Sequence, residues 1–131
     1  MTDEFYMRRA IELAKKGRGW TNPNPMVGAV IVKDGSIIGE GYHEKCGELH
    51  AERNAIASLT ESAEGATIYV TLEPCPMCAG AILNARIRRV FYGARDDVMG
   101  ACGGVLNLYM EGFPRPPQLV GNICGDECRD V

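Results

Sequence analysis

The stretch ATIYVTLEPCPMCAGAILNAR, residues 66–86, is an apolar run followed at once by a segment with helical spacing. The run 66–72 predicts a buried β-strand, and Pro76 suits the first turn of a helix, where its missing N–H would have had no partner. A further apolar run, RVFYG at 89–93, predicts the next strand. A strand, a crossover helix and a second strand imply two parallel strands in one sheet.

The sequence before this unit predicts two helices and a hairpin. Residues 5–16 place apolar side chains on one face, as in an amphipathic helix. Residues 26–43 form two β-type runs around Asp34-Gly35, a strong hairpin signal, so two antiparallel strands are expected. LHAERNAIASL, residues 49–59, has the apolar spacing of a second helix.

The sequence after residue 93 gives weaker signals. We expect a short helix at 105–109, a short edge strand within 118–124 and a last helical turn or two in 126–131. No repeat or low-complexity tract interrupts the chain, which predicts one domain spanning 1–131.

The composition excludes several classes of protein. The chain is 46% hydrophobic and 24% charged, as in globular proteins, and its formal net charge of -3 is unlike the basic excess of proteins that coat nucleic acid. The N-terminal run MTDEFYMRRAIELAKKG is unlike a signal peptide, and no run approaches the ~20 apolar residues of a membrane span. We therefore expect a cytoplasmic protein with no membrane partner.

Six cysteines in a reducing compartment favour metal binding or catalysis over a disulfide framework. Four of them are expected to be small apolar side chains that fill the core. These four are Cys46, Cys102, Cys124 and Cys128.

Four arginines lie close together in the sequence: Arg86, Arg88, Arg89 and Arg95. They are expected to form part of a solvated surface, and a local phosphate-binding patch is the alternative.

Cys75 and Cys78 stand at the start of the helix predicted from Pro76 onward. The positive end of a helix dipole favours thiolate over thiol there, which suits a redox pair and a metal pair equally. His50 and Glu52 open the other predicted helix, so if the two helices pack side by side, one imidazole and two thiolates converge. Three such ligands with a vacant fourth position are typical of a catalytic zinc, which lowers the pKa of a bound water.

Two other classes of protein stay open at this point. A structural zinc module needs a fourth protein ligand, for which His43 is the only other histidine. A dithiol redox protein would use Cys75 and Cys78 as its reactive pair, although it has no need of the His-x-Glu segment.

His50, Glu52, Pro74, Cys75 and Cys78 match every position of the zinc deaminase signature, His-x-Glu followed by Pro-Cys-x-x-Cys. Through these residues the chain resembles the cytidine deaminase-like superfamily over nearly its whole length. The resemblance implies a three-layer α/β/α sandwich with a mixed five-stranded sheet, one Zn²⁺ per subunit, and a homodimer or higher homo-oligomer. It further implies that His50, Cys75 and Cys78 bind zinc and that Glu52 shuttles the proton.

The same resemblance suggests residues that touch the substrate. Asn24 is expected to reach the substrate ring, and backbone near Ala51 and Pro74 to line the pocket. The reaction implied is removal of an exocyclic amino group from a nucleobase-type ring, with release of ammonia.

Two branches of the superfamily compete for the substrate. The first half, from AIELAKKGRGWTNPNPMVGAV to GELHAE, resembles the pyrimidine deaminase domain of riboflavin biosynthesis. The second half, from ATIYVTLEPCPMCAGAILNAR onward, resembles the tRNA adenosine deaminases that convert wobble adenosine to inosine. We expect a small nucleobase-type substrate (a free base, a nucleoside or a riboflavin-pathway-like pyrimidine), with tRNA as the alternative partner.

Overall fold

The computed structural model describes residues 2–20 and 25–131. These residues form one five-stranded sheet in the order β2-β1-β3-β4-β5, in which β1 is antiparallel to both neighbours and β3, β4 and β5 are parallel. In chain order the elements are α1 (Asp3–Lys15), β1 (Gly28–Lys33), β2 (Ser36–Tyr42), α2 (Ala51–Ala57), β3 (Thr67–Leu72), α3 (Pro76–Asn84), β4 (Arg89–Ala94), the 3-10 turn η1 (Leu108–Met110), β5 (Gln118–Val120) and α4 (Gly125–Arg129). This is the mixed sheet that the sequence predicts.

The predicted hairpin is formed by β1 and β2. Its two-residue turn has Asp34 and Gly35 at φ values of 52° and 78°, the geometry that matches the right-handed twist of the flanking strands. Lys33 pairs with Ser36 directly across the turn. The Asp-Gly signal therefore fixes the position of the turn and the register beside it, and a β-bulge between Ile31 and Val32 shifts the register of the rest of the hairpin.

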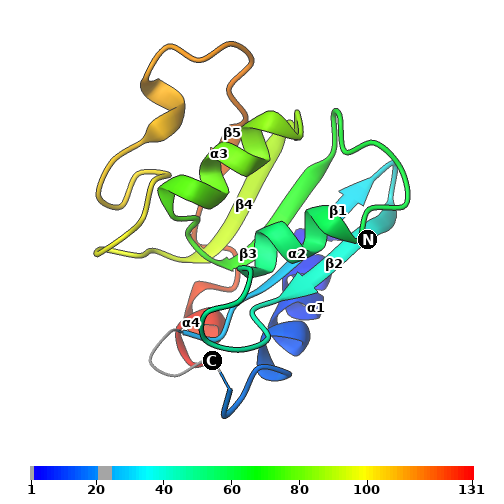
Figure 1. Ribbon diagram of the computed structural model, residues 1–131, viewed down its shortest axis with the longest axis vertical. Helices are drawn as coiled ribbons and strands as arrows, with labels where there is room; N and C mark the ends of the chain where they lie inside the picture. The colour runs from blue at the N-terminus through cyan, green and yellow to red at the C-terminus, as the bar shows by residue number, and fades with distance from the viewer. Residues whose placement is uncertain (1, 21–24) are drawn as a thin grey trace.

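The helices cover both faces of the sheet and produce three layers (Figure 1). α2 and α3 pack side by side over one face, and α1 and α4 cover the other. Alternate β1 residues point to opposite layers, because Ile31 belongs to the core under α2 and α3 whereas Val30 belongs to the core under α1. Such two-sided burial explains why β1 and β3 are nearly continuous apolar runs in the sequence.

The start of β1 and the ends of β2, β3 and β4 lie along the same edge of the sheet, the one formed by strand ends and not by an outer strand. The strand directions require this arrangement. We call this edge the helix-start edge, because α2 and α3 each follow a strand that ends there. The residues that flank its strands are Val27, His43, Glu73 and Arg95.

Two expectations need correction, and one is confirmed. Residues 105–109 are not a helix: only the 3-10 turn η1 forms, at 108–110. Only two of the four cysteines predicted to fill the core are buried, Cys102 and Cys128. Cys46 is exposed and Cys124 is half-buried. The four clustered arginines are all exposed, in agreement with the expected solvated surface, and the length of β4 separates Arg95 from Arg86, Arg88 and Arg89.

In the part of the chain that the structure describes, no helix has the length and apolar character to span a membrane.

Candidate metal centre and active site

His50 and Cys75 occupy equivalent positions on neighbouring helices. Each is the residue before the first helical turn, with extended backbone (φ −69° and ψ 163° for His50, φ −74° and ψ 170° for Cys75). Neither side chain hydrogen-bonds to its own helix as a cap, so both are available for another ligand. Cys78 lies one turn into α3 and is fully buried. The packing of α2 beside α3 therefore joins the two halves of the sequence motif.

The three side chains fit a zinc ion. The ligand atoms of His50, Cys75 and Cys78 all lie within 4.8 Å of one another, and His50 Nδ1 is 3.7 Å from Cys75 Sγ and 3.4 Å from Cys78 Sγ. Zinc bonds of about 2.3 Å to sulfur and about 2.05 Å to nitrogen, at a tetrahedral angle, place the two atoms about 3.6 Å apart. The site therefore has the spacing of a tetrahedral zinc centre.

The two thiols have unequal proton affinities. A hydrogen bond with Cys78 lowers the pKa of Cys75 to about 5, and the same hydrogen bond together with burial raises the pKa of Cys78. Cys75 is therefore a thiolate at neutral pH. A bound cation provides the charge that would keep Cys78 deprotonated as well.

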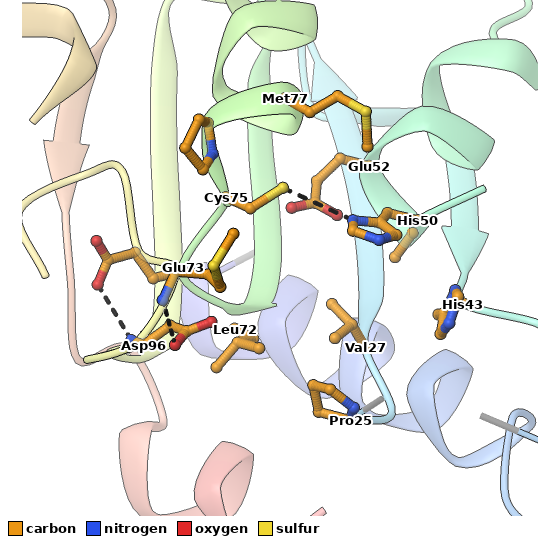
Figure 2. Close-up of a pocket in the computed structure, with 13 residues that line it drawn as sticks. Pro25, Val27, His43, His50, Glu52, Leu72, Glu73, Cys75, Met77 and Asp96 are labelled. Atoms are coloured by element: carbon orange, nitrogen blue, oxygen red, sulfur yellow. Dashed lines mark hydrogen bonds between the residues drawn. The ribbon is translucent and has the colours of Figure 1, made fainter. Parts of the chain in front are cut away.

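Glu52 lies next to these groups, and its side chain is 3% exposed. Burial raises the pKa of its carboxyl group to about 7, while the nearby His50 acts in the opposite direction. In Figure 2 the carboxylate lies between Cys75 and His50 and faces the cavity. A buried carboxyl group beside a metal centre can accept and donate a proton within a reaction.

A cavity of about 480 Å³ opens over the metal centre on the helix-start edge. His50, Glu52 and Cys75 are on one side of it, and Pro25, Val27 and Leu72 lie opposite them (Figure 2). Its volume suits a small heterocyclic ligand, and its wall combines apolar side chains with a few polar groups.

The other site predictions have separate outcomes. Ala51 is among the residues that line the cavity, and so are Glu73 and Cys75, on either side of Pro74. Pro74 itself is buried, and its carbonyl oxygen accepts a hydrogen bond of 2.9 Å from Ala101 N. Asn24 lies outside the described residues.

His43 does not complete a four-ligand site. Its Nδ1 lies 3.2 Å from the Leu49 carbonyl oxygen, and its ring packs edge-on against His50 with the centroids 5.4 Å apart. Among the residues that the structure describes, the metal-binding group contains three side chains and no fourth histidine, cysteine or carboxylate. A zinc ion held by these three side chains would keep a fourth position for water or substrate, as a catalytic zinc requires.

Several cavity residues were not anticipated from the sequence: His43, Glu73, Asp96 and Met99. His43, Glu73 and Asp96 lie within two residues of the end of a strand, at the helix-start edge, and Met99 lies in the loop after β4. The rule that ligands bind at the carboxyl ends of parallel strands could have indicated Glu73 and Asp96.

The comparisons with known proteins agree with this geometry. The cytidine and deoxycytidylate deaminase zinc-binding region matches residues 1–94. The riboflavin biosynthesis protein RibD of Actinobacillus pleuropneumoniae is 58% identical, over 98% of this chain and 35% of that protein. The diaminohydroxyphosphoribosylamino-pyrimidine deaminase of Buchnera aphidicola is 48% identical, over 86% of this chain and 82% of that protein. The chain spans about a third of the length of the RibD relatives, 35% and 33% for the first two.

Solved structures give the same result. Acinetobacter baumannii RibD superposes with a TM-score of 0.86 and 40% identity, over 98% of this chain and 37% of that one. A tRNA:A34 deaminase superposes with a TM-score of 0.77 and 30% identity, over 96% and 97% of the two chains. Both resemblances inferred from the sequence are thereby confirmed. Because the family model covers residues 1–94 and the relatives are up to 58% identical over nearly the whole chain, the chain belongs to the cytidine and deoxycytidylate deaminase family.

Proposed function

We propose that this protein deaminates a diaminohydroxyphosphoribosylaminopyrimidine, replacing an exocyclic amino group with oxygen and releasing ammonia. The observation that carries the proposal is the convergence of His50, Cys75, Cys78 and Glu52 on one small cavity. The substrate class is supported by the curated relatives, which are riboflavin biosynthesis proteins and pyrimidine deaminases of this name.

In this proposal His50, Cys75 and Cys78 hold the zinc ion, which when bound supplies a water of lowered pKa as the nucleophile. The apolar walls at Val27 and Leu72 contact the ring and exclude bulk water, which strengthens electrostatic interactions in the cavity. The Glu52 carboxylate accepts the proton of the water and returns it to the departing amino nitrogen, so that ammonia leaves.

Glu52→Gln tests the proton-transfer role. The substitution keeps the shape of the side chain but removes its capacity to accept and return a proton. We expect ammonia release to fall by about 10²- to 10⁴-fold while zinc content is unchanged. Glu111→Gln, at an exposed position, is the matched control and should behave as the unmodified enzyme. A Glu52→Gln enzyme that retains zinc and loses less than tenfold in rate would refute the role.

A second candidate substrate is the wobble adenosine of a tRNA, because the tRNA:A34 deaminase aligns over nearly the whole of both chains. The net charge of -3 argues against this alternative, since binding a polyanion depends on several well-placed cations. Incubation with the pyrimidine, with free bases and nucleosides, and with an anticodon stem-loop, scored by ammonia release, separates the candidates. Activity confined to the stem-loop would overturn our proposal.

We further propose that residues 1–131 act as one deaminase domain in the cytoplasm, with one zinc ion per subunit and as a homodimer or higher homo-oligomer. The zinc stoichiometry is supported by the single group of three ligands among the described residues. Elemental analysis of the purified protein and light scattering would give the metal content and the number of subunits.

A further inference from the structure

A second hollow of about 490 Å³ adjoins the cavity, and we call it the side hollow. The two share His50 and Met77, which form the wall between them. In Figure 2 Met77 stands on the α3 side of the cavity, away from Pro25 and Val27. A substrate whose ring occupies the cavity can therefore extend a substituent past Met77 into the side hollow.

Arg53 is the only lysine or arginine among the described residues that line the cavity or the side hollow. Its Nη1 donates to Met77 Sδ at 3.7 Å, and thioether sulfur is a weak acceptor. Among the described residues no carboxylate forms an ion pair with Arg53. Arg53 is a half-buried residue whose guanidinium carries five donors, and with no carboxylate partner in the described part of the chain it is suited to an anionic ligand.

The other polar groups of the side hollow already have partners. The Glu48 carboxylate forms an ion pair with Lys45 at 3.4 Å. The Asn54 amide donates to the carbonyl oxygens of Tyr42 and Leu49, at 2.9 and 3.2 Å. Within the side hollow, Arg53 is therefore the group available to a ligand.

Three other arginines lie too far away to serve the same substrate, and Arg95, at the helix-start edge, lines neither the cavity nor the side hollow. Arg86, Arg88 and Arg115 line a separate hollow beside the starts of β3 and β4, whereas the cavity lies at the ends of these strands. A strand of six residues spans about 20 Å, more than a single phosphoribosyl group can bridge.

We propose that Arg53 binds the phosphate of the phosphoribosyl group while the pyrimidine ring lies in the cavity, which makes Arg53 a specificity-determining residue. This inference rests on the proposed function. The planar guanidinium can donate two parallel hydrogen bonds to a phosphate, and the exposed, unbranched Met77 side chain can turn aside to admit it. Arg53 touches no reacting atom, so its effect falls on substrate binding and selection.

The test compares the phosphorylated pyrimidine with the same compound after removal of its phosphate. Arg53→Gln should raise the KM for the phosphorylated compound by about tenfold to a hundredfold, the range for losing a charge-assisted hydrogen bond. Its KM for the dephosphorylated compound should stay within about twofold. Arg53→Lys should recover part of the preference. Arg115→Gln, an equivalent change in the separate hollow, should leave both KM values unchanged.

The following results would overturn the phosphate assignment or the proposed function. If Arg53→Gln raises both KM values equally, or neither, Arg53 does not bind the phosphate. If the unmodified enzyme deaminates neither compound, the proposed function fails, and titration with ribose 5-phosphate then decides the subsite. Binding by the unmodified protein and not by Arg53→Gln would support it, whereas equal binding by both, or binding by neither, would refute it.

Discussion

Glu73 joins two parts of the chain that are 23 to 31 residues apart in sequence. Its buried carboxylate accepts hydrogen bonds from the backbone N–H groups of Asp96, Cys102 and Gly104, at 3.2, 2.9 and 2.7 Å. A Cβ atom at Gly100 or Gly104 would lie 2.5 or 2.6 Å from this carboxylate, so the loop closes around it. Because the loop carries Asp96 and Met99 to the cavity, one side chain connects the end of β3 to the substrate site.

Glu73→Gln should therefore weaken both stability and substrate binding. An amide presents one accepting oxygen in place of two, so at least one of the three N–H groups loses its acceptor in either orientation. We expect the free energy of unfolding to fall by about 1–3 kcal/mol in urea titrations. The KM should rise, because the loop no longer holds Asp96 and Met99 in place.

The control for Glu73→Gln is the exposed Glu111→Gln, which should change neither quantity. Zinc content should be retained in both variants, since the ligands lie on α2 and α3. A loss of stability below about 0.5 kcal/mol, the range of ordinary surface substitutions, would show that the loop does not depend on Glu73.

At the scale of elements, the position of α2 on the sheet decides whether the metal ligands meet. Gly41 in β2 lies directly under this helix, and a Cβ atom there would collide with Ala55 N and lie 2.6 Å from Ala51 O. Gly28 in β1 likewise lies directly under α1, and a Cβ atom there would collide with Ala10 O. The sheet thus has a close contact with one helix on each face, and only one of these helices carries a ligand.

Gly41→Ala and Gly28→Ala form a matched pair. Each should reduce the free energy of unfolding by about 1–3 kcal/mol, because backbone atoms must move to admit the methyl group. Only Gly41→Ala should weaken zinc binding, since it displaces the helix that holds His50 and Glu52. Competition with a chromophoric chelator, on protein that remains folded, measures the difference. Equal zinc affinity in the two variants would contradict this view of α2.

The elements that the sequence predicted correctly are those whose conformation is determined by residues close together in the sequence. The Asp34-Gly35 turn, the proline at the start of α3 and the two-sided apolar strands each act within a few residues. The predicted helix at 105–109 failed because this segment takes its conformation from a distant carboxylate: Glu73 binds Cys102 and Gly104 just before it. The motif likewise gave three ligands and Glu52, whereas Asp96 and Met99 reach the cavity only through the sheet topology.

At the scale of the whole molecule, the metal centre and the main cores are separate. The two apolar cores lie on opposite faces of the sheet and join α1, α2, α3 and the strands without using the ligand atoms. The metal centre lies at one edge, between the starts of two helices. The fold therefore does not need the ion to bury its apolar side chains, unlike a zinc finger, which is unfolded without metal.

Removal of zinc should lower the stability of this protein without unfolding it. Free zinc at a hundredfold excess over its Kd stabilises a folded protein by about 2.7 kcal/mol, which corresponds to a shift in Tm of roughly 10 °C for a chain of this size. Scanning calorimetry before and after chelation should give two cooperative transitions separated by about this amount, with near-ultraviolet circular dichroism retained at 25 °C. Loss of that signal on chelation would mean that the ion holds the fold together, and that an open hydrolytic centre is the wrong description of the site.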